Sequence, residues 1–208
     1  MTFDKENWKL VFKDYLWKPL LQDTSVPYAN AEKIIVSDCD GVLTDGTSEI
    51  GYDTCGNIRK ISKTYGAYDK EALRFMQKLN WDFIFVSDDI EGFPITKYRI
   101  NTWSANVEIL NRDSESRKDL IDYYKHKGYE IVIFIGDSVT DLEVLYSKGL
   151  SAFYTPHNAS WITKNHPQVI CPTSKIGGQG AFAEILYRIH LDYKENHGTS
   201  DNRFSEPQ

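Results

Sequence analysis

The chain has 208 residues, of which 41% are hydrophobic and 26% charged, and its formal net charge is −6 at pH 7. This length allows one domain with a sizeable core, and the composition is ordinary for a soluble globular protein. The acidic balance argues against binding to a nucleic-acid polymer, and no apolar run is long enough to span a bilayer. The three cysteines show no paired spacing, which predicts neither a disulfide framework nor a zinc site and favours a reducing cytoplasm.

The first expected element is an amphipathic helix over residues 5–17, ended by Pro19. Its apolar residues recur at helical spacing, and its mixture of acids and lysines indicates packing on a protein surface rather than on a membrane. A polar connector over residues 22–31 follows. We therefore expect residues 1–32 to be a helical extension that precedes the main domain.

The next segment, residues 34–46 with the sequence IIVSDCDGVLTDG, predicts a strand followed by a site. The short β-branched run is typical of a buried parallel strand. Alternation along an extended chain places Asp38 and Asp40 on the same side, at the carboxyl end of the strand where ligands bind in open α/β sheets. Two neighbouring carboxylates need a shared cation or proton. Cys39, between them, is expected to be a small buried filler that faces the other way.

The remaining segments alternate between strand and helix patterns. In chain order we expect a hairpin over 47–61, a helix over 69–79, a strand over 81–86, a helix over 95–103, a brief strand over 107–110, a helix over 114–127, a strand over 131–135, a helix over 141–148, a strand near 150–154, loops over 155–179 and a last helix over 181–191. This order predicts an α/β, Rossmann-like parallel sheet with helices on both faces. The main domain is expected over residues 33–192, with a flexible polar tail over residues 193–208.

Polar side chains follow three of these strands: Asp38 with Asp40, then Ser87, then Asp137 with Asp141. If the sheet is parallel, all of them meet at one edge. Such a carboxylate cluster suits a hard cation, most plausibly Mg²⁺. Together with a lysine and a hydroxyl donor, these groups can neutralise a transferring phosphoryl group, and a carboxylate can be its nucleophile.

The segment DCDGVLTDG, Ser87, Lys118 and the GDSVTD segment at 136–141 resemble, in order, the four motifs of the haloacid dehalogenase superfamily. The opening motif and the GGQGAFAE segment at 177–184 resemble a narrower group, the capless sugar-acid phosphatases such as 3-deoxy-D-manno-octulosonate 8-phosphate phosphatase. The resemblance covers about residues 33–191. It implies a magnesium-dependent phosphomonoesterase that acts on a sugar or sugar-acid phosphate through an aspartyl-phosphate.

The resemblance also implies roles for the two motif aspartates. Asp38 would be the nucleophile and a magnesium ligand. Asp40 would protonate the leaving oxygen and then activate water, and its main-chain carbonyl would bind the metal. The presence of Asp40 separates the chain from dehalogenases, which lack an acid at this position.

The other motifs carry supporting roles by the same resemblance. Asp137 would be the third protein ligand of the metal, and Asp141 would orient the lysine or a metal-bound water. Ser87, with Gly41, would bind the phosphoryl group, and Lys118 would hold its charge. Arg117 is the alternative at the lysine position.

The short intervals between the motifs predict that no cap domain is present. In the capless type a hairpin from a neighbouring subunit covers the site, so the resemblance implies a homo-oligomer, a tetramer. The Gly177–Gly180 segment is either a plain turn or a loop near the site or at a subunit contact.

Two departures make the substrate uncertain. The segment after the hairpin carries an Asp-Gly pair in the sugar-acid phosphatases, whereas this chain has Tyr65-Gly66. Where the sugar-acid phosphatases have Gly-Arg after the second motif, this chain has Asp88-Asp89, which would repel a substrate carboxylate. Arg59 or Arg99 could substitute for the missing arginine. A nucleotide monophosphatase is therefore an alternative function, and so is a catalytically quiet assembly or regulatory protein of the same fold. Transfer to an acceptor other than water also stays open.

Overall fold

We describe a computed structural model of the chain, for residues 32–103, 108–111 and 114–197. The helix expected over residues 5–17 lies outside the described residues, as does most of the expected tail. Among the described residues no helix is both long and apolar enough to cross a membrane.

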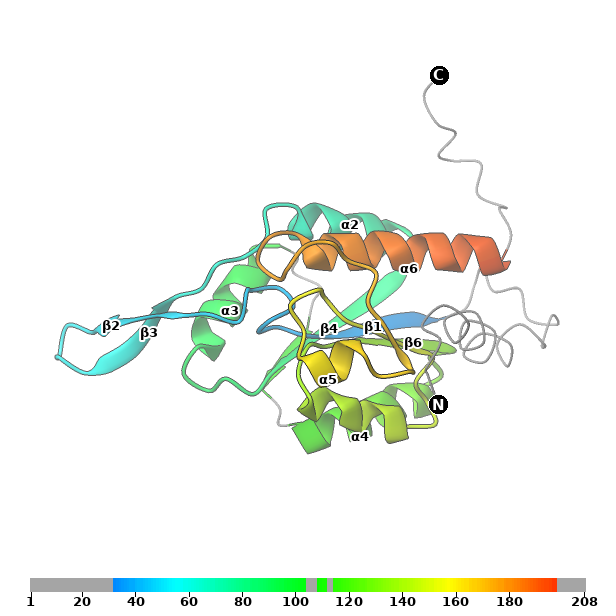
Figure 1. Ribbon diagram of the computed structural model, residues 1–208, viewed down its shortest axis with the longest axis horizontal. Helices are drawn as coiled ribbons and strands as arrows, with labels where there is room; N and C mark the ends of the chain where they lie inside the picture. Colours follow the sequence, from blue (N-terminus) through cyan, green and yellow to red (C-terminus); the bar gives the residue numbers. More distant parts are fainter. Residues whose placement is uncertain (1–31, 104–107, 112–113, 198–208) are drawn as a thin grey trace, which may run out of the picture.

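The centre of the protein is a six-stranded sheet in which every pairing is parallel (Figure 1). The strands in spatial order are β5 (Glu108–Asn111), β4 (Trp81–Ser87), β1 (Lys33–Asp38), β6 (Ile131–Ile135), β7 (Ala152–Tyr154) and β8 (Val169–Ile170). All six residues of β1 are buried, because β1 lies between β4 and β6 and is covered on both faces. This central strand thus ends at Asp38, and Asp40 lies on the turn that follows it.

Helices cover both faces of the sheet, as predicted (Figure 1). On one face α2 (Asp69–Lys78) and α6 (Ala181–His197) pack together, and residues such as Leu73 and Phe182 join Ile35 of β1 in one core cluster. On the other face α4 (Ser114–His126) and the 3₁₀ helix η2 (Thr140–Tyr146) pack against Val36 and its neighbours. The alternation of β1 side chains between two cores fixes the orientation of the strand.

A small antiparallel hairpin follows β1. Its strands are β2 (Glu49–Tyr52) and β3 (Ile58–Ser62), and it extends away from the sheet (Figure 1). A bridge between Thr44 and Tyr65 joins the chain on either side of the hairpin. Between β1 and β4 the chain forms only this hairpin and α2, so the prediction that no cap domain is inserted there is confirmed.

Several boundaries differ from those expected. The segment 155–179, expected as loops, contains α5 (Trp161–Lys164), which Ser160 caps, and the two-residue strand β8. Both are too short to give a periodic sequence signal. The helix α3 spans Phe93–Asn101, and α6 continues to His197, beyond the expected end at residue 191.

Candidate active site

The parallel register brings the polar strand ends together. Asp38 pairs with Val86, which is one residue before Ser87, and Ser37 pairs with Ile135, which is two residues before Asp137. Side chains that are about 50 to 100 positions apart in the sequence therefore share one edge of the sheet. This is the edge at which the sequence analysis predicted the site.

Three carboxylates form the centre of the site. Oxygen atoms of Asp38, Asp137 and Asp141 lie within 4.8 Å of one another. Gly41 has a φ of +83°, and a Cβ at this position would overlap the Asp137 carboxylate, so the turn after β1 needs glycine for both reasons. The donor set of closely spaced carboxylates fits a hard divalent cation.

The electrostatics support this fit. Burial is the largest effect that raises the pKa of Asp38 well above its ordinary value, and the neighbouring Asp141 adds to it. Burial and Asp141 also raise the pKa of Asp137 to about 7. A bound cation would stabilise the charged form of these buried carboxylates, because its attraction offsets both their desolvation and their mutual repulsion.

Arg117 is the cation that the structure brings into this cluster. It is buried at the start of α4, and its guanidinium donates one hydrogen bond to Asp38 at 2.9 Å and another to Asp141. The second oxygen of Asp141 accepts hydrogen bonds from the backbone N–H groups of residues 137 and 138. Asp141 thus orients the guanidinium and the loop that carries Asp137.

Lys118, which the sequence analysis placed in the site, is not there. Its ammonium pairs with Asp122 at 3.0 Å and with Asp119 at 3.7 Å on the outer side of α4. The physical reason is helical phase, because adjacent residues point about 100° apart. The buried residues Leu120, Ile121 and Tyr124 mark the inward stripe, and residue 117 continues it three, four and seven positions earlier.

Asp40 lies beside the triad and is bound by a lysine that the sequence analysis missed. The Lys63 ammonium donates to both oxygens of the Asp40 carboxylate, at 2.7 and 2.9 Å. Thr44 and Ser87 also donate to this carboxylate, each at 3.3 Å. Although burial acts against it, the interactions of the ammonium with the carboxylates of Asp40 and Asp89 raise the pKa of Lys63, so the ammonium stays charged. No local pattern identifies Lys63, because only the folded path of the chain after the hairpin brings it to β1.

The two acids after Ser87 lie in different surroundings. The Asp89 carboxylate pairs with Lys60 at 2.7 Å and with Lys63 at 2.7 Å, and it also accepts from the Gly92 N–H at the start of α3. Although burial acts to raise it, the hydrogen bonds from the two lysines lower the pKa of Asp89 to about 2. Two ammonium groups therefore neutralise Asp89, and its predicted repulsion of a substrate carboxylate is removed. Asp88 is exposed, 3.9 Å from Arg117.

The Gly177–Gly180 segment packs against the turn after β1. The Asn158 side chain donates to the Gly41 carbonyl at 2.9 Å and accepts from the Gly177 N–H at 2.8 Å. A Cβ at Gly177 would overlap the Gly41 and Thr44 carbonyls. Of the alternatives left open by the sequence, this segment is the loop beside the site.

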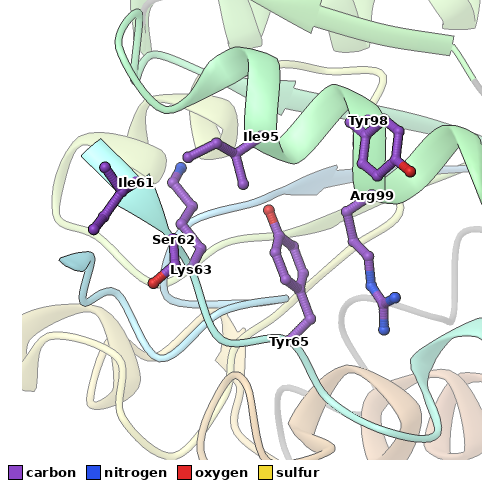
Figure 2. Close-up of a pocket in the computed structure, with 7 residues that line it drawn as sticks. All are labelled: Ile61, Ser62, Lys63, Tyr65, Ile95, Tyr98 and Arg99. Carbon is purple, nitrogen blue, oxygen red and sulfur yellow. The ribbon is translucent and has the colours of Figure 1, made fainter. Parts of the chain in front are cut away.

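A surface pocket of about 320 Å³ adjoins Asp40 through Lys63 (Figure 2). Its lining comes from the end of β3, the chain that follows it and α3: Ile61, Ser62, Lys63, Tyr65, Ile95, Tyr98 and Arg99. The Arg99 guanidinium lies near the rings of Tyr65 and Trp103, at 5.8 and 5.7 Å from their centroids. Arg59, by contrast, pairs with Asp53 on the hairpin. Arg99 is thus the arginine that lines a pocket next to the site.

Cys39 is buried in the core, as expected from its place in the strand pattern. Burial raises the pKa of its thiol well above the ordinary value, and Asp38 and Asp40 add to this effect. A thiol in this state is a poor nucleophile at neutral pH.

The sequence matches no protein-family model and no curated protein. Solved structures, however, resemble it over most of its length. The cobalt-bound deoxy-D-mannose-octulosonate 8-phosphate phosphatase of Haemophilus influenzae aligns with a TM-score of 0.64 and 22% identity, over 82% of this chain and 94% of that chain.

Two further phosphatases give the same result. The 3-deoxy-D-manno-octulosonate 8-phosphate phosphatase of Moraxella catarrhalis, in complex with magnesium, phosphate and its sugar acid, aligns with a TM-score of 0.62 and 20% identity, over 86% and 92% of the two chains. The enzyme of that name from Yersinia pestis aligns with a TM-score of 0.63 and 20% identity, over 83% and 87%. The protein therefore has the Rossmann-like fold of the haloacid dehalogenase-type phosphatases that the sequence motifs resemble.

Proposed function

We propose that the protein is a phosphatase that hydrolyses a small phosphomonoester through an aspartyl-phosphate at Asp38. The observation that carries this proposal is the cluster of Asp38, Asp137 and Asp141, in which one guanidinium donates to Asp38 and Asp141, with Asp40 beside them. Asp38 would be the nucleophile, Asp40 the acid and base, and the Arg117 guanidinium a cation close to the negatively charged phosphoryl group.

In the first step of this mechanism Asp38 attacks phosphorus and the bond to the leaving oxygen breaks. Arg117 orients the attacking carboxylate, Ser87 and the Gly41 N–H hydrogen-bond the phosphoryl oxygens, and protonated Asp40 gives its proton to the leaving oxygen. In the second step Asp40 takes a proton from water, the water oxygen attacks phosphorus, and Asp38 leaves as a free carboxylate. Phosphate and an alcohol are the products.

We propose Mg²⁺ as the cofactor, held by the carboxylates of Asp38 and Asp137 and by the main-chain carbonyl of Asp40. When bound, it would neutralise charge on the phosphoryl oxygens. The magnesium and cobalt in the two solved phosphatases support a divalent cation here.

The pH dependence of stability tests this metal site. In metal-free protein Asp137 has a pKa of about 7, above its unfolded value, so its contribution is fully present below pH 4 and is lost as pH rises through 7. In chelator, we expect the melting temperature of Asp137→Asn to rise relative to that of wild type as the pH is raised from 5 to 8. Mg²⁺ should reverse the order at pH 8, because only wild type binds it tightly. A variant-to-wild-type difference that is flat with pH, or unaffected by Mg²⁺, would contradict the assignment.

For the substrate we propose a sugar or sugar-acid phosphate whose leaving portion occupies the pocket lined by Tyr65, Tyr98 and Arg99. Arg99 supplies a cation for an acidic group on the leaving portion. The test is phosphate release with Mg²⁺ from matched panels of acidic sugar, neutral sugar and nucleotide monophosphates. Faster turnover of the acidic sugars supports the proposal, preference for nucleotides indicates the alternative substrate class, and no turnover together with no metal binding indicates the quiet assembly protein.

We also propose that the protein forms a homo-oligomer, a tetramer, through the hairpin. Ile50, Tyr52 and Ile58 are 63%, 76% and 66% exposed on it, which is unusual for apolar side chains that lie together. A second copy that covers the hairpin would bury them. Light scattering of the full chain tests this, and a monomer at micromolar concentration would contradict it. A cytoplasmic location, which the spacing of the three cysteines favours, stays a prediction.

A further inference from the structure

A salt-bridge cluster joins Asp40 to Lys63 and Asp89, and these last two residues have no part in the mechanism above. Lys63 is almost entirely buried, with a side chain that is 1% exposed, whereas the Asp40 side chain is 28% exposed. The cluster connects three elements, because Asp40 follows β1, Lys63 follows β3 and Asp89 precedes α3. A buried lysine held between two carboxylates costs desolvation free energy, so its presence beside the acid of the site needs a reason.

Three groups surround the Lys63 ammonium. It donates to the Asp40 carboxylate at 2.7 Å and to the Thr96 hydroxyl at 3.2 Å, and it forms an ion pair with Asp89 at 2.7 Å. Tyr65 donates to the same Thr96 hydroxyl at 3.1 Å and holds it in place. Figure 2 shows that the Lys63 and Tyr65 polar ends both point toward α3. Lys63 therefore cannot bind a substrate without giving up one of these partners.

Asp89 fixes the position of the lysine in turn. Its other oxygen takes Lys60 at 2.7 Å and the Gly92 N–H at 3.1 Å, so the carboxylate is tied to both β3 and the start of α3. The ammonium is thus held by groups on two rigid elements before any ligand arrives. Asp40 lies on the turn after β1, and its carboxylate takes its direction from this ammonium.

From this geometry, and resting on the function proposed above, we propose that Lys63 is a positioning residue that holds Asp40 in the orientation needed for proton transfer to the leaving oxygen. Asp40 makes the proton transfer, and Lys63 acts through Asp40 rather than on the substrate. Its effect should then depend on how much the leaving oxygen needs a proton.

The experiment compares two substrates in wild type, Lys63→Met, Lys63→Arg and Lys60→Met. One substrate is the sugar phosphate turned over fastest by wild type, whose alkoxide leaving group needs protonation. The other is p-nitrophenyl phosphate, whose phenolate does not. The quantity is kcat/KM, which reports the steps up to phosphoryl transfer. Lys60→Met is the matched control, because Lys60 shares Asp89 but does not contact Asp40.

We expect Lys63→Met to lower kcat/KM for the sugar phosphate by about 10²-fold, within the range of general acid catalysis, and to lower it less than about tenfold for p-nitrophenyl phosphate. The loss should lie in kcat with KM little changed, Lys63→Arg should recover part of it, and Lys60→Met should lose clearly less than Lys63→Met on the sugar phosphate. If Lys63→Met fails to fold, Lys63→Arg still tests the proposal through the same difference between substrates.

Equal losses on both substrates, a loss confined to KM, or an equal effect of Lys60→Met would overturn the positioning role. Unchanged kinetics in Lys63→Met would do the same. The failure of the proposed function has a different signature, because wild type itself would then release no phosphate from either substrate.

Discussion

Asp38→Asn is expected to lose phosphatase activity by about 10⁴-fold or more, because the amide cannot attack phosphorus. The variant should nevertheless fold. Burial raises the pKa of Asp38, so the charged carboxylate is a burden on the metal-free fold that a neutral amide of the same shape removes. We therefore expect its melting temperature in chelator at pH 8 to equal or exceed that of wild type.

Asp45→Asn is the matched control for this variant. Asp45 belongs to the same motif, but its carboxylate accepts hydrogen bonds from its near neighbour Thr47, through the N–H and the hydroxyl. Activity close to wild type is expected for the control. An Asp38→Asn protein that kept more than about one hundredth of the activity would contradict the nucleophile assignment.

The second large effect is expected at Arg117. Arg117→Met leaves Asp38 and Asp141 buried without their cation, and breaking a buried pair in this way costs about 3–5 kcal/mol of unfolding free energy. Activity should fall by about 10²- to 10³-fold, because the phosphoryl charge and the nucleophile lose their shared partner. Urea unfolding and phosphate release measure the two effects.

The neighbouring Lys118→Met supplies the control, since its ammonium pairs only with exposed or half-buried acids on α4. We expect its activity and unfolding midpoint to match wild type. If Arg117→Met does not fold, Arg117→Lys should fold and still lose activity, because an ammonium cannot donate to two carboxylates in the planar geometry of a guanidinium. If Lys118→Met lost activity and Arg117→Met did not, Lys118 would be the residue that holds the phosphoryl charge, as the sequence resemblance implies.

The comparison of these two residues illustrates what the sequence could predict. The β1 strand, the paired aspartates and the parallel sheet could be predicted from local patterns. A β-branched run that ends in Asp-x-Asp-Gly indicates a buried strand followed by a site, whatever the rest of the chain does. Selecting Arg117 over Lys118 required the phase of α4. The apolar residues 120, 121 and 124 define the inward face of the helix, and residue 117 lies on that face. Choosing lysine by residue type alone, without this helical phase, selected Lys118 instead.

Lys63 and Asp89 were beyond prediction for a different reason. Lys63 comes to Asp40 only because the hairpin returns to the turn after β1, and Asp89 is neutral in effect only because Lys60 and Lys63 reach it. Contacts of this kind depend on tertiary packing and leave no periodic trace in the sequence. In the sequence, Asp88-Asp89 made a sugar-acid substrate doubtful. Because Asp89 is paired with two lysines in the structure, this loop is compatible with such a substrate.

The most direct test of the central claim is to trap the phosphorylated enzyme. Wild type is mixed with Mg²⁺ and its best substrate, quenched during turnover and reduced with borohydride, which converts an acyl phosphate of aspartate to homoserine. Mass spectrometry of the peptides should find homoserine at residue 38 in wild type and none in Asp38→Asn. Phosphate release without any modification at residue 38, or a modification at another carboxylate, would contradict the account.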